Sequence, residues 1–475
     1  MVEVLVIGAG PAGLAAAIAA RARGASVVLV DSADYLGGQF WRHLPETRPA
    51  RAEHKLHHGW ARFVALRARL EDDEGCRILT SAQVWAVETL GDRITARVLV
   101  GVPDGTDRRH LAFSPDAVVL ATGAHDRTLP FPGWDLPGVF TAGAAQALAK
   151  GERIAVGRRV VVAGAGPFLL PVAASLAQTG SRVLGVYEAN GGAALARGWL
   201  PRPWQLVGVS AKGLELAGYI GNQVKRRIPY RVGHGVIAAQ GTDRVEAVTI
   251  AALDADWRPR PGTERTVEVD AVCVGHGFTP RLELAIAAGC ELTPERFVHV
   301  ADDQRTSVDG VYAAGEATGI GGVDLALAEG TIAGHAAAGG VVADRELRGA
   351  RGKRRTFAGF AVRIEAAHGI RDGWSSWLSD DTVVCRCEEV SYGSLCTMAG
   401  ATGSVSLRSL KLTTRAGLGI CQGRICGRTI ETLLAHQAPD GVLCDGTTVD
   451  RRPIASPIRI SELSATPTNP TKGTE

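Results

Sequence analysis

Two glycine-rich turns, each placed directly after a short apolar run, constrain this chain more than any other feature. The first turn, Gly8-Ala9-Gly10-Pro11-Ala12-Gly13, follows residues 2–7, and the second, Gly164-Ala165-Gly166-Pro167, follows residues 160–163. Both runs are rich in the β-branched residues typical of strands buried in a parallel sheet, and a helix-forming segment comes after each turn. Strand, turn and helix in this order predict a dinucleotide-type βαβ unit, and the chain carries two of them.

The residues of the first turn match what phosphate binding requires. Gly8 permits a tight turn, Gly10 lets the backbone approach a pyrophosphate, and Gly13 lets the helix pack closely on the strand. Pro11 and Ala12 begin the helix, whose free N–H groups and partial positive charge face the phosphates. This motif alone does not distinguish FAD from NAD.

An acidic residue ends the strand that follows each turn, Asp31 in the first unit and Glu188 in the second. A carboxylate there can accept hydrogen bonds from a ribose, and it repels a 2′-phosphate. The second unit departs from the pattern because Leu169 replaces the third glycine, so its helix lies further from the strand or its turn differs. NAD or ATP is therefore favoured over NADP there, and a domain that keeps the fold without turning over nicotinamide is an equal alternative.

Four of the nine cysteines form two close pairs, Cys385-Arg386-Cys387 and Cys421-x4-Cys426. Because the number of cysteines is odd and they cluster near the C-terminal end, they argue for a reducing compartment and a metal site rather than a disulfide framework. Four thiolates suit a 2Fe-2S cluster, in which each iron takes one pair, and C-x-C is a tight spacing for the alternative, zinc. Glycines that would wrap a cluster and donate N–H groups to its sulfurs are Gly417, Gly419, Gly423 and Gly427. The other cysteines read as ordinary thiols: Cys76, Cys273, Cys290, Cys396 and Cys444.

Composition excludes several classes of protein. The formal net charge of +3 is too balanced for a nucleic-acid-binding protein. Glycine contributes 59 of 475 residues, well above the usual share of about 7%, and without a collagen-like period this excess belongs in turns and close backbone contacts. The apolar N-terminal segment contains Glu3 and several glycines, so it reads as strand, turn and helix rather than a signal peptide. No transmembrane segment is predicted, and a cytoplasmic location is expected.

Residues 1–345 resemble the flavoprotein superfamily with two dinucleotide-binding domains, in which FAD occupies the N-terminal site. The segment TSVDGVYAAGE resembles the block whose acidic residue binds the flavin ribityl chain. Aspartate is usual there, so Glu316 moves the carboxylate by one methylene. Further FAD-binding positions implied by the resemblance are Gly38, Gln39, Val84, Ala121, Thr122, Gly123 and Gly315.

The segments CRCEEV and KLTTRAGLGICQGRICG resemble a C-terminal module akin to bacterioferritin-associated ferredoxin. That module occurs in the α-type subunits of heteromeric flavin-dependent amino-acid and amine dehydrogenases, which include opine oxidases, proline and hydroxyproline dehydrogenases and hydrogen cyanide synthase. The segment ATGAHDRTLPFPGWDLPGVFTAGAAQAL is similar to the same group. The resemblance therefore implies a subunit that contains FAD and a 2Fe-2S cluster held by Cys385, Cys387, Cys421 and Cys426.

The same resemblance implies partners and a reaction. It implies a D-amino-acid-oxidase-like flavoprotein partner, and in some members a small third subunit. Such complexes oxidise the C–N bond of an amino acid, imino acid or opine and pass electrons through flavin and 2Fe-2S to an acceptor. A second nucleotide (NAD or ATP), an FMN shared with the partner, and membrane association through a partner are left open. The rivals are a stand-alone NAD(P)H-dependent FAD/Fe-S reductase and a non-catalytic electron-relay subunit.

We therefore predict an α/β fold with two Rossmann-like domains, the first of them split. The FAD domain is expected at 1–150 and 277–345, and the second nucleotide domain at 151–276. A linker is expected at 346–380, an α-rich cluster domain at 381–463 and a flexible tail at 464–475. The basic run 345–355 is expected to be a solvated hinge. His125 and His276 are expected to be structural, and no residue is assigned as the catalytic base.

Overall fold

The computed structural model describes residues 2–45, 47–48, 53–90, 93–437, 450–452 and 454–465. Cys444 and most of the predicted tail lie outside these residues. The chain divides into two compact units, each assembled from separate segments. Unit 1 comprises Met1–His125, Pro280–Ala361 and Arg451–Glu475, and unit 2 comprises Asp126–Thr279 and Val362–Asp450.

Unit 1 is built on a five-stranded parallel sheet in the order β18-β7-β1-β2-β3. Its central strand is fully buried from Val4 to Val6, as the continuous apolar run predicted. The strands are β1 (Glu3–Ile7), β2 (Ser26–Val30), β3 (Cys76–Leu79), β7 (Ala117–Leu120) and β18 (Val311–Ala313). The helices are α1 (Pro11–Ala22), α2 (Glu53–Leu56), α3 (Trp60–Glu71), α8 (Glu283–Ala287), α9 (Gly322–Ala337) and α14 (Ile460–Ser464).

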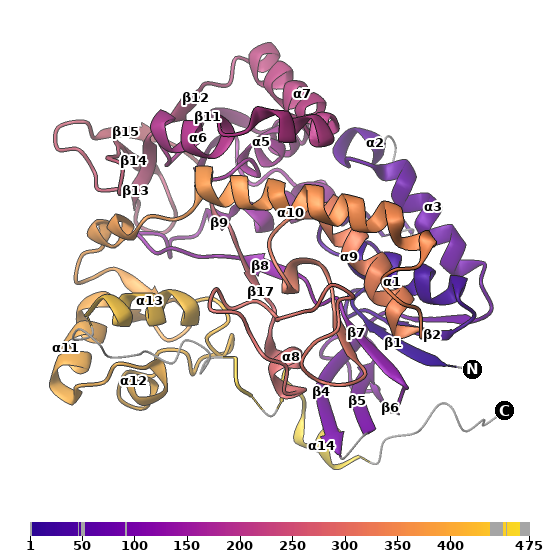
Figure 1. The fold of residues 1–475 in the computed structure, drawn as a ribbon. Coiled ribbons are helices and arrows are strands. Elements are labelled where there is room, and N and C mark those ends of the chain that lie inside the picture. Colours follow the sequence, from indigo (N-terminus) through magenta and orange to yellow (C-terminus); the bar gives the residue numbers. More distant parts are fainter. Residues whose placement is uncertain are drawn as a thin grey trace. The chain divides into compact units, whose positions relative to one another are not determined.

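Helices α1 and α9 lie side by side (Figure 1) at a distance that only glycine permits. A methyl group at Gly330 would overlap the carbonyl oxygen of Ala12, and one at Gly334 would overlap that of Ala16. The two backbones therefore touch over a full turn of helix. This contact fixes the start of α1, and with it the first glycine turn, against an element that comes more than 300 residues later in the chain.

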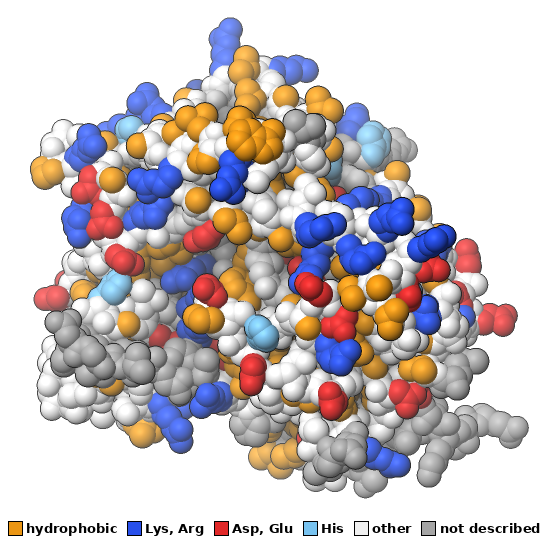
Figure 2. Space-filling view, viewed as in Figure 1, with side chains coloured by type: hydrophobic (Ala, Val, Ile, Leu, Met, Phe, Trp, Pro, Cys, Tyr) orange, Lys and Arg blue, Asp and Glu red, His pale blue; other side chains and the backbone are white. Residues whose placement is uncertain are grey.

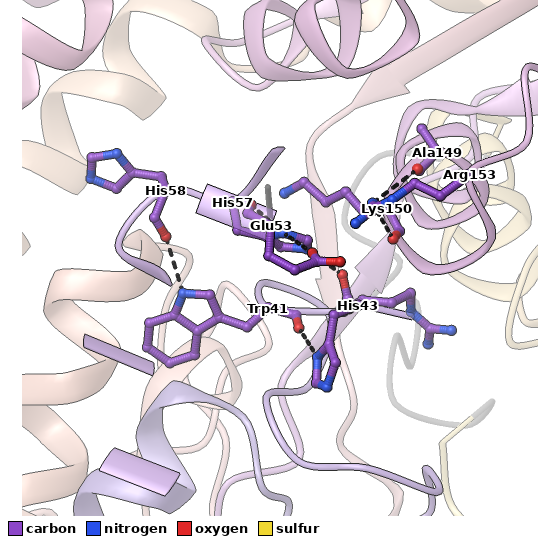
Figure 3. Close-up of polar contacts among 9 residues, drawn as sticks. Trp41, His43, Glu53, His57, His58, Ala149, Lys150 and Arg153 are labelled. Atoms are coloured by element: carbon purple, nitrogen blue, oxygen red, sulfur yellow. Dashed lines mark hydrogen bonds and ion pairs between the residues drawn. The ribbon is translucent and has the colours of Figure 1, made fainter. Parts of the chain in front are cut away.

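The segment after β2 is anchored by buried polar contacts, which Figure 3 shows. The Trp41 indole donates to the carbonyl oxygen of His58 (3.0 Å), and Nδ1 of His57 lies 2.9 Å from Oε2 of Glu53. Nδ1 of His43 lies 2.7 Å from the carbonyl oxygen of Trp41. The backbone N–H of Gly37 donates to the carbonyl oxygen of Ala9 (2.9 Å), which places the neighbouring Gly38 beside the first glycine turn. An antiparallel sheet completes the unit with β4 (Ala82–Leu90), β5 (Arg93–Val100) and β6 (Arg109–Phe113).

Unit 2 repeats the parallel sheet in the order β12-β11-β10-β16-β9. Its strands are β9 (Val139–Thr141), β10 (Arg159–Ala165), β11 (Arg182–Glu188), β12 (Tyr230–Val232) and β16 (Ala271–His276), and an antiparallel sheet is formed by β13 (His234–Gln240), β14 (Ala247–Ala252) and β15 (Arg265–Glu268). The helices are α4 (Ala142–Ala147), α5 (Leu169–Gln178), α6 (Gly192–Trp199) and α7 (Ser210–Arg226). Strands β8 (Ala124–Asp126) and β17 (Phe278–Pro280) pair with each other.

The cysteine-rich module belongs to unit 2 and shares one hydrophobic core with the second sheet. The Trp134 indole donates to the carbonyl oxygen of Val383, and the Thr429 hydroxyl donates to that of Thr128 (2.6 Å). The module contains β19 (Val383–Cys385), β20 (Val390–Ser391), α11 (Tyr392–Thr402), α12 (Leu407–Thr414) and α13 (Gly427–Gln437). Shorter helical turns in the chain are η1 (Leu148–Glu152), η2 (Pro203–Val209), η3 (Gly315–Ala317), η4 (Arg345–Leu347) and η5 (Asp372–Trp377).

The structure divides the chain differently from the predicted domain boundaries. β9 pairs with β16, so residues 126–150 belong to the second unit rather than to the FAD domain. The predicted linker contains the 21-residue helix α10 (Arg348–His368), and the basic run 345–355 lies in η4 and the first turns of that helix. Arginine, alanine, leucine, glutamate and lysine in this run are good helix formers, and it contains no proline, so the helix forms despite Gly349 and Gly352.

The predicted α/β fold with two Rossmann-like domains and a C-terminal cluster domain is confirmed. Within the described part of the chain, no helix is both long and apolar enough to cross a membrane.

The contact between α1 and α9 gives a first prediction. Gly334→Ala places a methyl group on the Ala16 carbonyl, so we expect it to destabilise unit 1 by about 1–3 kcal/mol. Thermal unfolding of the flavin-loaded chain, followed by flavin fluorescence, measures this loss.

Gly349→Ala is the matched control, because Gly349 lies in helix α10 with nothing within 4 Å of the added methyl. It should leave the unfolding midpoint unchanged or raise it slightly. Equal midpoints for the two variants would mean that the backbone contact is not required.

Candidate functional site

The first glycine turn forms a cradle of backbone at the carboxyl end of the unit 1 sheet. Gly8 has φ +105°, and a methyl group on it would overlap the carbonyl oxygen of Ala121. A methyl group on Gly13 would overlap the carbonyl oxygen of Gly8, so the helix packs on the turn as predicted. At Gly38 the added carbon would lie 2.8 Å from Cα of Gly10. Residues predicted from three separate segments therefore meet at one place.

The second part of this cradle comes from late in the chain. A methyl group on Gly315 would lie 2.8 Å from Cβ of Ala12, so η3 touches the first turn of α1. Helix α1 begins at Pro11, directly after Gly10, and Gly10 offers no side chain to cap it. Its first N–H groups are therefore available to an anion. This arrangement fits the pyrophosphate of a dinucleotide.

Asp31 has a more local role than the predicted ribose contact alone. Its carboxylate accepts from the backbone N–H groups of Ala9 (2.6 Å) and Ala33 (2.8 Å), so it ties the glycine turn to the end of β2. Burial raises the pKa of this carboxyl, and the two backbone donors oppose the shift. The residue stays partly exposed, which leaves room for a ribose hydroxyl.

The other predicted flavin positions lie around the same edge. Thr122 donates to the carbonyl oxygen of Arg281 (2.8 Å), and Gly123 has φ +69°. Gln39 is exposed and accepts from Arg42 (3.2 Å). Val84 is buried in β4, whose first residue, Ala82, donates to the carbonyl oxygen of Asp31 (2.8 Å). Whether each of them touches a flavin stays a prediction.

Two carboxyls follow the cradle, Glu316 partly exposed at its surface and Glu329 buried, and the sequence indicated the first of them. Burial raises the pKa of Glu316 to about 7, opposed by a hydrogen bond from the backbone of Gly322 at the start of α9. Glu329 accepts from the Gly315 N–H and the Thr318 hydroxyl, both at 2.9 Å, and burial raises its pKa to about 7 as well. Its signal in the sequence is an acid in the middle of the apolar helix α9, one turn and a half after Asp324.

The second glycine turn has a different shape from the first. A methyl group on Gly164 would overlap the carbonyl oxygen of Gly275, which preserves the close strand contact. Helix α5, however, begins at Leu169, after a short turn that follows Gly166, whereas α1 begins at the residue after Gly10. Leu169 is fully buried, so the third-glycine contact is replaced by a packed leucine. The turn itself differs, which was one of the two outcomes predicted.

Glu188, the predicted ribose acid of unit 2, is fully engaged by the chain itself. Its side chain is 0% exposed, and Oε2 accepts from the Gly166 N–H at 2.8 Å. Oε1 accepts from the backbone and the amide of Asn190, at 3.0 and 3.2 Å. Nδ1 of His368, the last residue of α10, lies 3.0 Å from Oε2. His368 was not identified from the sequence, because it lies 180 residues away.

Arg363 holds the same end of α10 in place. This nearly buried side chain donates to the carbonyl oxygens of Gly198 (3.2 Å), Trp199 (3.3 Å) and Arg202 (2.9 Å). The last turns of α10 are therefore fastened next to the ribose position of the second domain.

The four predicted cluster cysteines come together, with contacts within the sequence pairs and across them. Sγ of Cys385 lies 3.6 Å from Sγ of Cys426, and Sγ of Cys387 lies 3.7 Å from Sγ of Cys421. Two sulfurs bound 2.3 Å from one tetrahedral metal are about 3.7 Å apart, so each pair fits one metal atom. Among the described residues, no three His, Cys, Asp or Glu side chains converge on one point.

The backbone around the cysteines fits a cluster. The Gly417 N–H donates to Sγ of Cys385 (3.4 Å), and a methyl group on Gly419 would overlap Sγ of Cys387. Hydrogen bonds from the neighbouring thiol Cys426 lower the pKa of Cys385 to about 6 and that of Cys421 to about 5. Burial raises the pKa of Cys387 to about 11, and hydrogen bonds to Cys385 and Cys421 raise that of Cys426. Two of the four thiols therefore favour the thiolate, which is the form that binds metal.

The two pairs differ in exposure. Cys385 and Cys426 are buried, whereas Cys387 is exposed and Cys421 is partly exposed. Next to Cys421, the side chain of Ile420 is 89% exposed. The site therefore has one inner metal position and one outer position that faces solvent.

His276 is buried in unit 2, its Nδ1 has no hydrogen-bond partner among the described residues, and its structural role stays a prediction. It is buried beside Trp257 and Trp377, with ring centroids 6.0 and 6.2 Å away. Burial lowers its pKa to about 4, so the ring is neutral near pH 7.

Comparison with known proteins assigns both parts of the chain. Residues 2–330 match the pyridine nucleotide-disulphide oxidoreductase family, and residues 383–436 match the BFD-like [2Fe-2S] binding domain. The chain is 32% identical to an opine oxidase subunit from Agrobacterium tumefaciens (strain Ach5), over 98% of this chain and 92% of that protein. It is also 32% identical to hydrogen cyanide synthase subunit HcnB of Pseudomonas aeruginosa, over 89% of this chain and 90% of that protein.

Among solved structures, an L-proline dehydrogenase from P. horikoshii is similar with a TM-score of 0.67 and 21% identity, over 98% of this chain and 79% of that one. This likeness concerns the fold. The order of the two domains and the geometry of their sites agree with the sequence matches over nearly the whole chain. The chain therefore belongs to the pyridine nucleotide-disulphide oxidoreductase family, as an FAD-dependent oxidoreductase that carries a BFD-like [2Fe-2S] domain.

Proposed function

We propose that this chain is the large subunit of a heteromeric dehydrogenase that oxidises the C–N bond of an amino acid, imino acid or opine. The observation that carries this proposal is the joint presence of a backbone cradle for FAD and a four-cysteine site in one chain. Relatives with the same two parts along nearly their whole length are named as subunits of opine oxidase and hydrogen cyanide synthase. The substrate classes considered are proline-like imino acids, opines and glycine.

Each cofactor would be held by its own set of residues. Gly8, Gly10, Gly13 and the first N–H groups of α1 would bind the FAD pyrophosphate, with Asp31 next to the ribose. Cys385 and Cys426 would hold the inner iron, and Cys387 and Cys421 the outer one. When bound, flavin exchanges two electrons and a 2Fe-2S cluster one at a time, which supplies the redox chemistry that no protein side chain provides.

The second nucleotide domain has, in this proposal, a structural role rather than a catalytic one. The Glu188 carboxylate already accepts hydrogen bonds from Gly166 and Asn190 and contacts His368. A ribose hydroxyl would have to displace these contacts from a fully buried group, which costs free energy. This observation disfavours the rival function of a stand-alone NAD(P)H-dependent reductase.

The substrate site, in this proposal, lies in or beside a partner chain. The relatives are named as subunits of larger enzymes, so we infer a D-amino-acid-oxidase-like flavoprotein partner that binds the amine substrate. A small third subunit, an FMN shared with the partner and membrane association through a partner belong to the same proposal. A cytoplasmic location belongs to it too, because four clustered thiols that bind a metal suit a reducing compartment.

The function is tested by mixing the chain with its partner flavoprotein under anaerobic conditions. We expect a dye acceptor to be reduced by proline, an opine or glycine only when both chains are present, because each chain supplies part of the route by which electrons pass from the substrate to the acceptor. Oxidation of an amine substrate by this chain alone would contradict the proposal.

NADH and NADPH should leave the flavin of this chain oxidised. The engaged Glu188 carboxylate makes nucleotide binding in unit 2 unfavourable, so absorbance near 450 nm should stay constant for minutes after anaerobic mixing. Dithionite serves as the positive control, and rapid bleaching by NADH would favour the stand-alone reductase.

The cysteine site predicts a selective loss of metal. Cys385→Ser and Cys387→Ser, one from each pair, should both lower iron and acid-labile sulfide sharply after anaerobic purification. Cys396→Ser, in helix α11 of the same module, should keep the wild-type iron content. Wild-type chain without iron and sulfide, or zinc in their place, would overturn the cluster assignment.

A further inference from the structure

One stretch of unit 2 exposes more apolar side chains than any other described part of the chain. Leu214 is 77% exposed, Val224 72%, Leu200 71% and Trp204 69%. In Figure 2, orange side chains gather with blue ones beside them over the region that Figure 1 labels α6 and α7. Together these residues form what we call the α7 surface: Leu200, Trp204, Leu214, Leu216, Ile220, Val224, Tyr230 and Val232. Contiguous exposed apolar surface of this kind marks an interaction site.

Helix α7 is amphipathic, but its apolar side faces solvent and its polar side faces the protein. Several of its polar side chains lie on the inner side: Lys212, Glu215 and Tyr219 are partly buried and bond one another (3.0 and 3.4 Å), and Gln223 is buried. These positions recur at the helical spacing of three or four residues, and Ile220 and Val224 share the opposite, exposed side. An isolated domain would turn that apolar side inward, so the exposed side is built to meet a second molecule.

The helix is fixed in this orientation rather than loosely attached. Nη1 of Arg226, near its end, donates to the carbonyl oxygen of Ala177 in helix α5 (2.9 Å), and Nε bonds Asn222 (3.1 Å). The backbone N–H of Ile228, a buried residue, then donates to the carbonyl oxygen of Gln223. The apolar side is therefore presented as a preformed surface about 25 Å long.

The exposed side contains positions without a side chain. Gly213 and Gly221 have nothing within 4 Å of an added methyl, and Ala217 lies between them on the same side. Small residues let another backbone approach closely and cost helix stability of about 1 kcal/mol per glycine. A lipid surface would gain more from large apolar side chains at these positions, so the glycines favour a protein as the occupant.

The rim of the α7 surface is strongly basic, because the one acid between residues 197 and 232, Glu215, faces the protein and is paired with Lys212. The exposed cations on the rim are Arg197, Arg202, Lys225, Arg227 and Arg231. Two copies of this chain meeting through the same surface would bring these charges together, which disfavours self-association. A partner with acidic residues around an apolar centre is complementary.

We infer that the α7 surface is the docking site for the other flavoprotein subunit of the complex, which presents an apolar patch bordered by Asp and Glu. This inference rests on the proposed function, because it takes its occupant from the heteromeric assembly. It adds which surface of this chain the partner covers and the charge that the partner must carry.

The test uses the full-length chain with flavin bound and its purified partner flavoprotein. Ile220→Asp/Val224→Asp should raise the dissociation constant by about tenfold or more, measured by light scattering and calorimetry, because it places charge in the apolar centre. Val64→Asp is the matched control, since Val64 is also a half-exposed apolar residue on a helix, α3 in unit 1. Wild-type flavin absorbance and unfolding midpoint in both variants show that each has folded.

A second variant separates charge from apolar contact. Lys225→Glu/Arg227→Glu should weaken the complex, and the difference from wild type should shrink at high salt. Unchanged affinity in both double variants would overturn the docking site while leaving the heteromeric function intact. A wild-type chain that binds no partner flavoprotein would overturn the function itself.

Two further arms test other occupants. Binding to vesicles containing anionic phosphatidylglycerol that is lost in Ile220→Asp/Val224→Asp, with partner affinity unchanged, would assign the surface to a membrane and overturn the inference. Wild-type self-association abolished by the same variant would overturn it in favour of a second copy.

Discussion

Direct contact between backbones, at positions where only glycine fits, is the constraint on which unit 1 depends. Gly8 meets the carbonyl of Ala121, and Gly330 and Gly334 meet carbonyls of α1. These contacts join segments from the beginning, the first third and the last third of the chain, and they add to the buried hydrophobic clusters that join the same segments. The same closeness leaves the start of α1 uncovered and preformed for a pyrophosphate, so the packing and the binding site arise from one arrangement.

The acid at the end of the second strand has different surroundings in the two dinucleotide units. In both, a carboxylate at the end of the second strand bonds an N–H of the glycine turn. In unit 1 that acid, Asp31, stays partly exposed. In unit 2 the acid, Glu188, is fully buried and makes further hydrogen bonds to Asn190 and to His368 at the end of α10. The shared contact stabilises the turn, and only the exposed version keeps capacity for a ligand. A common fold therefore does not imply a common function.

The features that could be predicted from the sequence are those that short motifs determine. The strands before both turns, the roles of Gly8 and Gly13 and the meeting of four cysteines follow from short motifs. What could not be predicted depends on long-range closure: the contact of Cys385 with Cys426 across the sequence pairs, the arrival of His368 at Glu188, and the transfer of residues 126–150 to the second unit through β9. The α10 helix was missed because a run of arginines reads as solvated charge, although arginine is a good helix former.

Helix α7 contains two features that are unfavourable for the isolated chain, its glycines and its exposed apolar side chains. Three glycines in a 17-residue helix cost about 3 kcal/mol relative to alanine, and the exposed leucines and valine add apolar surface to water. Neither feature stabilises this chain alone, and its polar contacts to α5 only set the orientation of the helix. Both features become favourable once a second backbone packs against the glycines and covers the apolar side chains. The physical demands on this segment therefore agree with the proposal that a partner subunit covers it.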